Sequence, residues 1–175
     1  MLNGRRGGST GLAAGVFLIA AALTVTIVAA VAGRDLASTE WRLLVLDPEG
    51  VTLAQTKLAD GRFALRYRNS VYGSLAEERF VVGNDGQIHL VGLAAEEPAV
   101  LGEYYTTRDP QPAEAGAALR WEAAPAHPVI LERLMLAATD LGERTLVVDG
   151  RAPIALWTFV PDSSPSLSLG AERIR

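Results

Sequence analysis

The sequence predicts an all-β domain, folded as an antiparallel sandwich or barrel-like structure, that follows a single N-terminal transmembrane helix. Two observations predict this fold class. An uncharged apolar run near the N-terminus is long enough to cross a membrane. The rest of the chain holds seven or eight short segments with the composition of strands, separated by turn residues. A chain of 175 residues leaves room for one domain of ordinary size after this run.

The predicted transmembrane anchor occupies residues 11–33, which carry no charged side chain. At about 1.5 Å of rise per residue, a helix of this length spans the roughly 30 Å hydrocarbon layer. Arg5 and Arg6 precede the run, so the positive-inside rule predicts that residues 1–10 are cytoplasmic and that the chain after the anchor is extracytoplasmic. We therefore expect a single-pass protein of the inner, or cytoplasmic, membrane whose residues 11–33 contact the lipid bilayer.

Two other interpretations of this run are open. Ala30-Val31-Ala32 fits the small-residue pattern of a signal peptidase site, although signal-peptide cores usually have only about 7 to 15 apolar residues. A cleaved signal peptide would leave the domain outside the cytoplasm as well. A buried helix of a soluble protein is less favoured, because no polar face interrupts the run.

The predicted extracytoplasmic domain covers residues 41–175, after a short polar linker at residues 34–40. Strands are expected where apolar and polar residues alternate or β-branched residues gather, and turns where Asp, Asn, Pro and Gly cluster. The expected strands are residues 41–46, 51–57, 63–67, 78–82, 87–91, 145–148, 152–159 and 166–170. Gly83-Asn84-Asp85-Gly86 predicts the clearest hairpin. Residues 145–148 and 152–159 are expected to form a second hairpin, and Pro153 suggests that part of it lies at a sheet edge.

Two segments are harder to interpret. Residues 94–128 are rich in alanine and proline, which predicts a long excursion with one strand near residues 119–122. Residues 129–140 fit either a helix or a long buried strand, and propensity alone favours the helix.

Charge and composition exclude several classes of function. Without Arg5 and Arg6, the 16 basic and 20 acidic residues leave a balance of −6, which argues against binding of nucleic acid. The sequence has no cysteine, so a disulfide framework, a thiolate zinc site and a catalytic thiol are all excluded. We expect no cofactor and no metal site.

The strand phase points to a polar pair. Every second residue of a strand shares a face, so Asn69 continues the inward face of the strand before it, and Glu78 begins the inward face of the next. We expect the two side chains at one end of an antiparallel pair, on either side of a loop at residues 70–77. A carboxylate there needs hydrogen-bond partners, so the pair either pins the loop or takes part in a site.

In the functional interpretation, Asn69 and Glu78 form a small polar pocket or a docking point for a partner, with Ser70, Arg66 and Arg68 nearby. The two arginines are expected on the solvent side of their strand, either solvated or paired with Glu77, and are the best basic candidates for an acidic ligand or partner.

The remaining acidic residues and the histidines offer less. Adjacent carboxylates, as in the pairs at residues 77–78 and 96–97, point to opposite faces of a strand, and apart from Glu78 we expect them to be surface charges. A hydrolase would need Ser70 beside His89 or His127, and no motif supports that arrangement.

One block of sequence carries a resemblance. Phe63-Ala-Leu-Arg-Tyr-Arg-Asn-Ser-Val71, followed by Glu78-Arg-Phe-Val-Val82, resembles the family called domain of unknown function 1850, in which an aromatic-rich strand ends in His-Ser-Val and a Glu-x-aromatic-x-Val strand follows. The likeness covers most of residues 41–170. Asn69 stands where the family usually has histidine, and residues 94–98 replace its glycine-rich segment.

The resemblance implies a small extracytoplasmic β-domain associated with tripartite (TRAP) transporters of the TAXI kind. It favours a non-enzymatic accessory subunit whose partners are integral membrane transporter subunits or a substrate-binding protein. A small-molecule-binding β-module on the cell exterior is the alternative, and a hydrolase is the least favoured function.

Overall fold

The structure, a computed structural model, describes residues 40–104 and 107–174. The predicted cytoplasmic N-terminus, the anchor at residues 11–33 and all of the linker but residue 40 lie outside the described residues. Within the described part of the chain, no helix combines the length and the apolar character of a membrane span.

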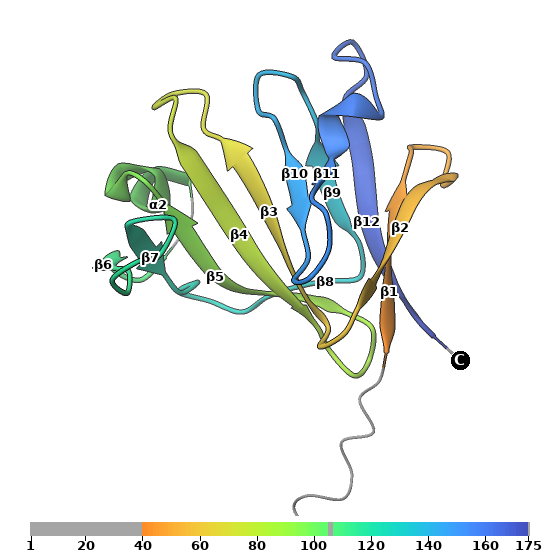
Figure 1. Cartoon of the computed structure of the whole chain (residues 1–175), viewed down its shortest axis with the longest axis horizontal. Coiled ribbons are helices and arrows are strands. Elements are labelled where there is room, and N and C mark those ends of the chain that lie inside the picture. The colour runs from red at the N-terminus through yellow and green to blue at the C-terminus, as the bar shows by residue number, and fades with distance from the viewer. Residues whose placement is uncertain (1–39, 105–106, 175) are drawn as a thin grey trace, which may run out of the picture. The chain divides into compact units, whose positions relative to one another are not determined.

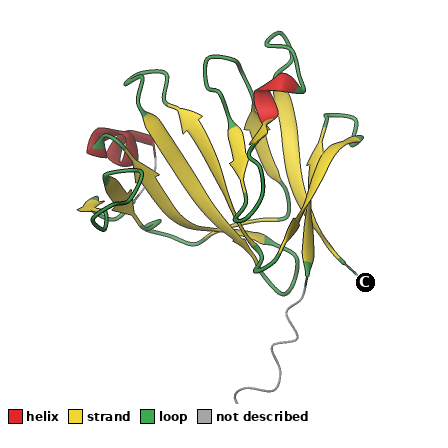
Figure 2. Ribbon diagram, in the orientation of Figure 1, coloured by secondary structure: helices red, strands yellow, loops and turns green. Residues whose placement is uncertain are grey.

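The described residues form two antiparallel sheets with very little helix, which confirms the predicted all-β class (Figures 1 and 2). Sheet A has four strands in the order β2-β1-β12-β9: β2 (Thr52–Leu58), β1 (Trp41–Leu46), β12 (Ser166–Arg173) and β9 (Leu134–Ala137). Sheet B has eight strands. Seven follow the order β11-β10-β3-β4-β5-β7-β6: β11 (Ile154–Ala155), β10 (Thr145–Val147), β3 (Arg62–Arg68), β4 (Leu75–Val82), β5 (Ile88–Ala95), β7 (Trp121–Ala123) and β6 (Gln111–Pro112). The eighth, β8 (Val129–Leu131), pairs with β5 beside β7.

Two short helical segments complete the described part of the domain. The helix α2 (Pro98–Tyr104) follows β5, and the 3-10 turn η1 (Leu156–Thr158) follows β11 (Figure 2). The chain passes between the sheets at the connections β2–β3, β8–β9, β9–β10 and β11–β12. The two separate sheets are thus connected several times and enclose a common core, so the architecture is sandwich-like.

The main core is formed by the inward faces of both sheets. Leu43 and Val45 of β1 and Leu167 and Leu169 of β12 come from sheet A, and Leu65 of β3 lies opposite them in sheet B, all at most 1% exposed. A second apolar cluster lies farther along sheet B, where Tyr67, Ala76, Leu93, Ala95, Val100 and Leu101 bring α2 against β3, β4 and β5. The helix therefore covers the part of sheet B that sheet A does not bury.

The centre of sheet B is the meander β3–β4–β5. Phe63 and Phe80 are cross-strand partners and stack with ring centroids 5.1 Å apart. Between β4 and β5 the register shifts, so that Arg79 pairs with Gly92 and Phe80 with Leu90. Val91 is the additional residue of this bulge and is 42% exposed.

The helical interpretation of residues 129–140 is wrong. The segment forms two strands: β8 pairs with β5 in sheet B, and β9 pairs with β12 in sheet A. Pairing partners in two sheets satisfy its backbone groups, and Leu136 and Ala138 alternate into the core as strand residues do. Tertiary pairing therefore overrides local helix propensity here.

Other elements differ from expectation in extent. The strand predicted at residues 119–122 is β7, but α2 and β6 were not predicted in this excursion. The segment expected as a strand at residues 152–159 is a two-residue edge strand followed by η1, which agrees with the edge position inferred from Pro153. The last strand, expected to be short, runs for eight residues between β1 and β9, because its charged end joins the ladder and Glu172 binds Arg42 at 2.9 Å.

Truncation of Leu65 to alanine should destabilise the domain by about 2–5 kcal/mol, because the side chain is fully buried between the sheets and leaves a cavity. Urea unfolding followed by tryptophan fluorescence measures the change. The matched control is Val71→Ala, at a residue 65% exposed in the β3–β4 loop, where a change within about 0.5 kcal/mol is expected. Equal effects of the two substitutions would contradict the placement of Leu65 in the core.

Candidate functional site

A groove of about 780 Å³ lies on the outer face of sheet B, the face opposite the main core. Its floor consists of two neighbouring rows of side chains across the sheet. One row contains Arg66 of β3, Glu77 of β4 and Glu122 of β7, and the other contains Arg79 of β4 beside Gly92 of β5. Three strands of sheet B, β3, β4 and β7, therefore supply the charged side chains of this floor.

A single carboxylate organises the floor. Glu77 Oε2 accepts hydrogen bonds from Arg66 Nη2 at 2.8 Å and Nε at 3.2 Å, and Glu77 Oε1 accepts one from Arg79 Nε at 3.0 Å. The Glu77 side chain is only 10% exposed, whereas the two arginine side chains are 40% and 42% exposed. Both oxygens of the carboxylate are thus engaged by the two arginines, while both guanidinium groups still face the groove.

This arrangement leaves donors available. A guanidinium group has five N–H donors in a rigid plane, and Glu77 uses two from Arg66 and one from Arg79. A further ion pair, from Arg79 Nη1 to Glu122 at 3.5 Å, is longer and joins two half-exposed side chains. Glu77 holds the remaining donors in position. The arginine side chains therefore lose less conformational entropy when an anion binds.

Two more arginines border the groove. Arg62 is 3.7 Å from Asp60, a long and exposed contact. Arg108 is exposed, and among the described residues no acceptor binds its guanidinium group. Asp109 and Asp149 lie at the rim as well, so that the groove as a whole contains both signs of charge.

The rest of the lining is small or apolar. Ala64 and Gly92 flank Arg79 across the strands, and Val91 and Val147 contribute apolar surface. A methyl group at Gly92 would come within 3.8 Å of Arg79 Cδ, in ordinary contact with the stem of that side chain. The groove can therefore receive a ligand with an anionic group and an apolar part. In the described residues, no cluster of three side chains suited to a metal ion occurs.

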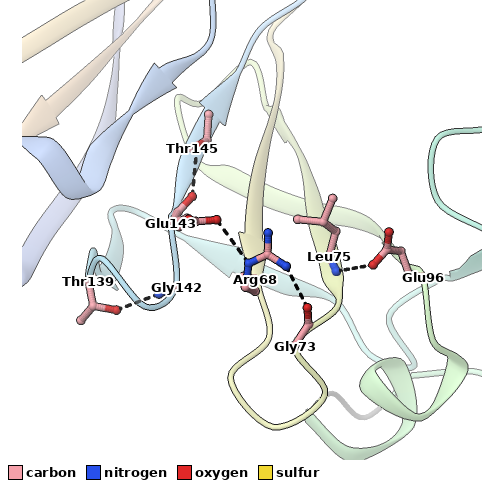
Figure 3. A network of polar contacts seen from close by, with 8 residues as sticks. All are labelled: Arg68, Gly73, Leu75, Glu96, Thr139, Gly142, Glu143 and Thr145. Carbon is pink, nitrogen blue, oxygen red and sulfur yellow. Dashed lines mark hydrogen bonds and ion pairs between the residues drawn. The ribbon is translucent and has the colours of Figure 1, made fainter.

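Of the five site residues predicted from the sequence, Arg66 alone lies in this groove. It pairs with Glu77, which was one of the two expected alternatives. The expectation that Glu77 is a surface charge is wrong, because β3, β5 and the two arginines enclose it. Arg68 has a different role. It donates to Gly73 O at 2.8 Å and pairs with Glu143 at 3.3 Å, which connects the β3–β4 and β9–β10 loops (Figure 3).

Asn69 and Ser70 lie in the β3–β4 loop. The Asn69 side chain is buried, and its Oδ1 accepts hydrogen bonds from the backbone N–H groups of Val71 at 2.9 Å and Tyr72 at 3.0 Å. Ser70 is exposed. The loop-pinning role is therefore observed for Asn69.

Glu78 does not meet Asn69 at the end of the strand pair, so that expectation is wrong. The strand β4 begins at Leu75, three residues before Glu78, and the loop is correspondingly shorter than residues 70–77. In the ladder, Glu78 lies opposite Leu65 on one side and Leu93 on the other. It thus occupies the inner face of sheet B between the two apolar clusters.

The register also separates Ser70 from His89, one of the two histidines of the hydrolase hypothesis. Ser70 lies in the loop before β4, whereas His89 pairs with Val81 near the other end of β4. A strand of eight residues therefore separates this serine from His89.

Sequence reasoning missed Arg79, Glu122 and Arg108. A signal for Arg79 was present, since Glu77 and Arg79 are two apart in a strand and must share a face. Glu122 and Arg108 come from the long excursion, whose path the sequence does not reveal.

A pair of carboxyl groups lies in two of the loops that connect the sheets, Asp140 in the β9–β10 loop and Asp162 in the β11–β12 connection. The backbone N–H of Asp140 donates to Asp162 Oδ1 at 3.0 Å. A hydrogen bond with the Asp162 side chain, followed by the negative charge of that group, raises the pKa of Asp140 above its ordinary value of 3.8.

The fold and the groove define the class of protein: an antiparallel β-sandwich-like domain with a charged groove on the outside of its larger sheet. A scan of protein-family models, a search of curated proteins and a search of solved structures find no match to this chain. Membership of the family of domain of unknown function 1850 stays a prediction that rests on the motif at residues 63–82.

Asn69→Ala should destabilise the domain by about 1–3 kcal/mol, because two backbone N–H groups lose their buried acceptor. Ser70→Ala is the neighbouring control, and its effect should stay within about 0.5 kcal/mol. Both are measured by urea unfolding. An unchanged stability of Asn69→Ala would show that the loop does not depend on this side chain.

Asp162→Asn should raise the melting temperature at pH 7 and leave it unchanged near pH 3.5. A folded-state pKa raised above 3.8 means that the contribution of Asp140 to stability is present below that pH and is lost as the pH rises through the raised value. At pH 7 the two carboxylates repel each other, and the amide removes one charge while keeping an oxygen acceptor. Thermal unfolding at the two pH values measures the effect, and the NMR titration of Asp140 should move toward 3.8. An equal gain at both pH values would refute the electrostatic cause.

Proposed function

We propose that the chain is a non-enzymatic, membrane-anchored binding module on the extracytoplasmic side, whose groove takes a small organic anion with a carboxylate head and an apolar body. The observation that carries this proposal is the buried Glu77 carboxylate, which holds Arg66 and Arg79 side by side with donors left toward the groove. Two parallel N–H donors match the two oxygens of a carboxylate, which is why arginine is common where such groups are recognised.

The surrounding surface supports the same ligand class. Ala64, Val91 and Val147 offer an apolar wall for the body of the ligand, and Arg108 adds a cation at the rim. The volume of about 780 Å³ lies within the range of pockets that hold small molecules. The extracytoplasmic location and the anchor rest on the sequence alone.

A second function is favoured by a different observation. The block that resembles domain of unknown function 1850 is the β3–β4 pair, which forms much of the groove floor. This supports the accessory subunit of a TRAP transporter of the TAXI kind, in which the groove would receive an acidic segment of a transporter subunit or of a substrate-binding protein.

The ligand-binding proposal is tested with the full-length protein in a non-ionic detergent. Benzoate, hexanoate and succinate are compared with their uncharged amides in thermal unfolding and calorimetric titration. At 100 times its Kd, a bound carboxylate should stabilise the protein by about 2.7 kcal/mol, whereas the amide of the same size should not. The double variant Arg66→Gln/Arg79→Gln should lose this stabilisation.

Arg68→Gln is the control, because it removes one arginine charge from β3, the strand of Arg66, outside the groove, and it should keep the stabilisation. Stabilisation by amides as well as acids, or its persistence in the double variant, would refute the carboxylate site.

A mild-detergent pull-down of tagged full-length protein from native membranes addresses the accessory function. Near-stoichiometric transporter subunits that are lost from the double variant, but not from Arg68→Gln, would support it, and recovery of the chain alone would remove it.

A further inference from the structure

A second cleft, of about 480 Å³, lies at the outer edge of sheet A and is independent of the groove on sheet B. Arg42 of β1 and Lys57 of the edge strand β2 line it, together with Gln55, Thr56 and Arg151. Arg151 belongs to the β10–β11 loop of the other sheet. The cleft thus collects three cationic side chains from both sheets, and no acidic residue is among those that line it.

The cationic side chains in this cleft are short of counter-charges. Arg42 and Lys57 are direct cross-strand partners, an arrangement that is unfavourable for like charges. Glu172, the other neighbour of Arg42, binds Arg42 Nη1 at 2.9 Å. Among the described residues, no carboxylate pairs with Lys57 or Arg151. Two positive charges therefore remain without compensation at one place on the surface.

Neutral donors lie beside these charges. Gln55 contributes an amide and Thr56 a hydroxyl group to the lining. β2 pairs with β1 alone, so its other side is a free sheet edge whose outward N–H groups have no strand partner in the described part of the chain. Cationic groups, a hydroxyl and amide donors around a small cleft are the chemistry that recognises a phosphate group.

We propose that this cleft is a binding site for a phosphate group, carried either by a free phosphate compound or by the headgroup of an anionic phospholipid. The second source is within reach of the chain. Arg42 is the second residue after the predicted linker, and seven linker residues at residues 34–40 span at most about 25 Å. If residues 11–33 are the retained anchor, this tether length limits how far Arg42 can lie from the lipid surface.

The sequence supplies a direct reporter for this site, because Lys57 is its only lysine. Modification of Lys57 by an amine-reactive ester, measured by mass spectrometry on the full-length protein, reports whether the cleft is occupied. The first probe is inorganic phosphate in non-ionic detergent, compared with sodium chloride at equal ionic strength. The second is phosphatidylglycerol in lipid nanodiscs, compared with nanodiscs of phosphatidylcholine alone.

Phosphate, phosphatidylglycerol or both should slow the modification of Lys57 relative to the matched control. Arg151→Gln should raise about tenfold the concentration of phosphate or phosphatidylglycerol that gives half-maximal protection. This is the loss of affinity expected when one charge-assisted hydrogen bond is removed. Arg120→Gln is the matched control, since Arg120 is a highly exposed arginine outside the cleft, and it should keep full protection.

Each pattern of protection has one meaning. Protection by phosphate alone assigns the cleft to a free phosphate compound, and protection by phosphatidylglycerol alone assigns it to a lipid headgroup. Protection by both, reduced by Arg151→Gln, supports a phosphate site open to either source. Protection no greater than that of sodium chloride or phosphatidylcholine, or protection that Arg151→Gln leaves unchanged, overturns the proposal.

Discussion

The register between β3 and β4 is the constraint on which both the core and the groove depend. With Phe63 opposite Phe80, the alternation of each strand sends Leu65 inward and Arg66 and Arg79 outward. A shift by one residue would exchange the two faces, because the side-chain period of a strand is two. The stacked phenylalanines at one end and the Asn69 turn at the other hold the pairing between them.

The same register gives Glu77 its unusual position. A carboxylate that is 10% exposed loses most of its hydration, and this loss is costly unless hydrogen bonds replace the lost water. Arg66 and Arg79 supply these bonds, yet each arginine stays about two-fifths exposed. The net stabilisation from such ion pairs is modest, so their main consequence is geometric. Glu77 holds two guanidinium groups in fixed orientations at the surface of a rigid sheet.

Local distribution of charge matters more in this domain than its net balance. The chain after the N-terminal arginines carries a balance of −6, which disfavours long anionic partners. Screening limits the reach of exposed charges to about 8 Å at physiological ionic strength. A groove with Arg66 and Arg79, and a cleft with Lys57 and Arg151, can therefore attract small anions in spite of that balance. The groove and the cleft share no lining residue, so their occupation need not be coupled.

The sequence by itself determined the all-β class and the central meander. Alternation marked β3 and its neighbours, and the glycine-rich turn at residues 83–86 marked the β4–β5 hairpin, because period and turn chemistry are local properties. It also identified Arg66 as an outward arginine with Glu77 as a possible partner. It misplaced Glu78 because the starting point of β4, and so the loop length, depends on pairing with β3.

Only the tertiary structure decided the remaining features. Residues 129–140 become two strands because partners in both sheets accept them, and the groove acquires Glu122 and Arg108 because a long excursion folds back along β5. The cleft of Lys57 and Arg151 likewise joins residues far apart in the chain. Hydrophobic period is encoded within a few residues, whereas the choice of strand partner depends on the whole chain, and that choice assembled both proposed binding surfaces.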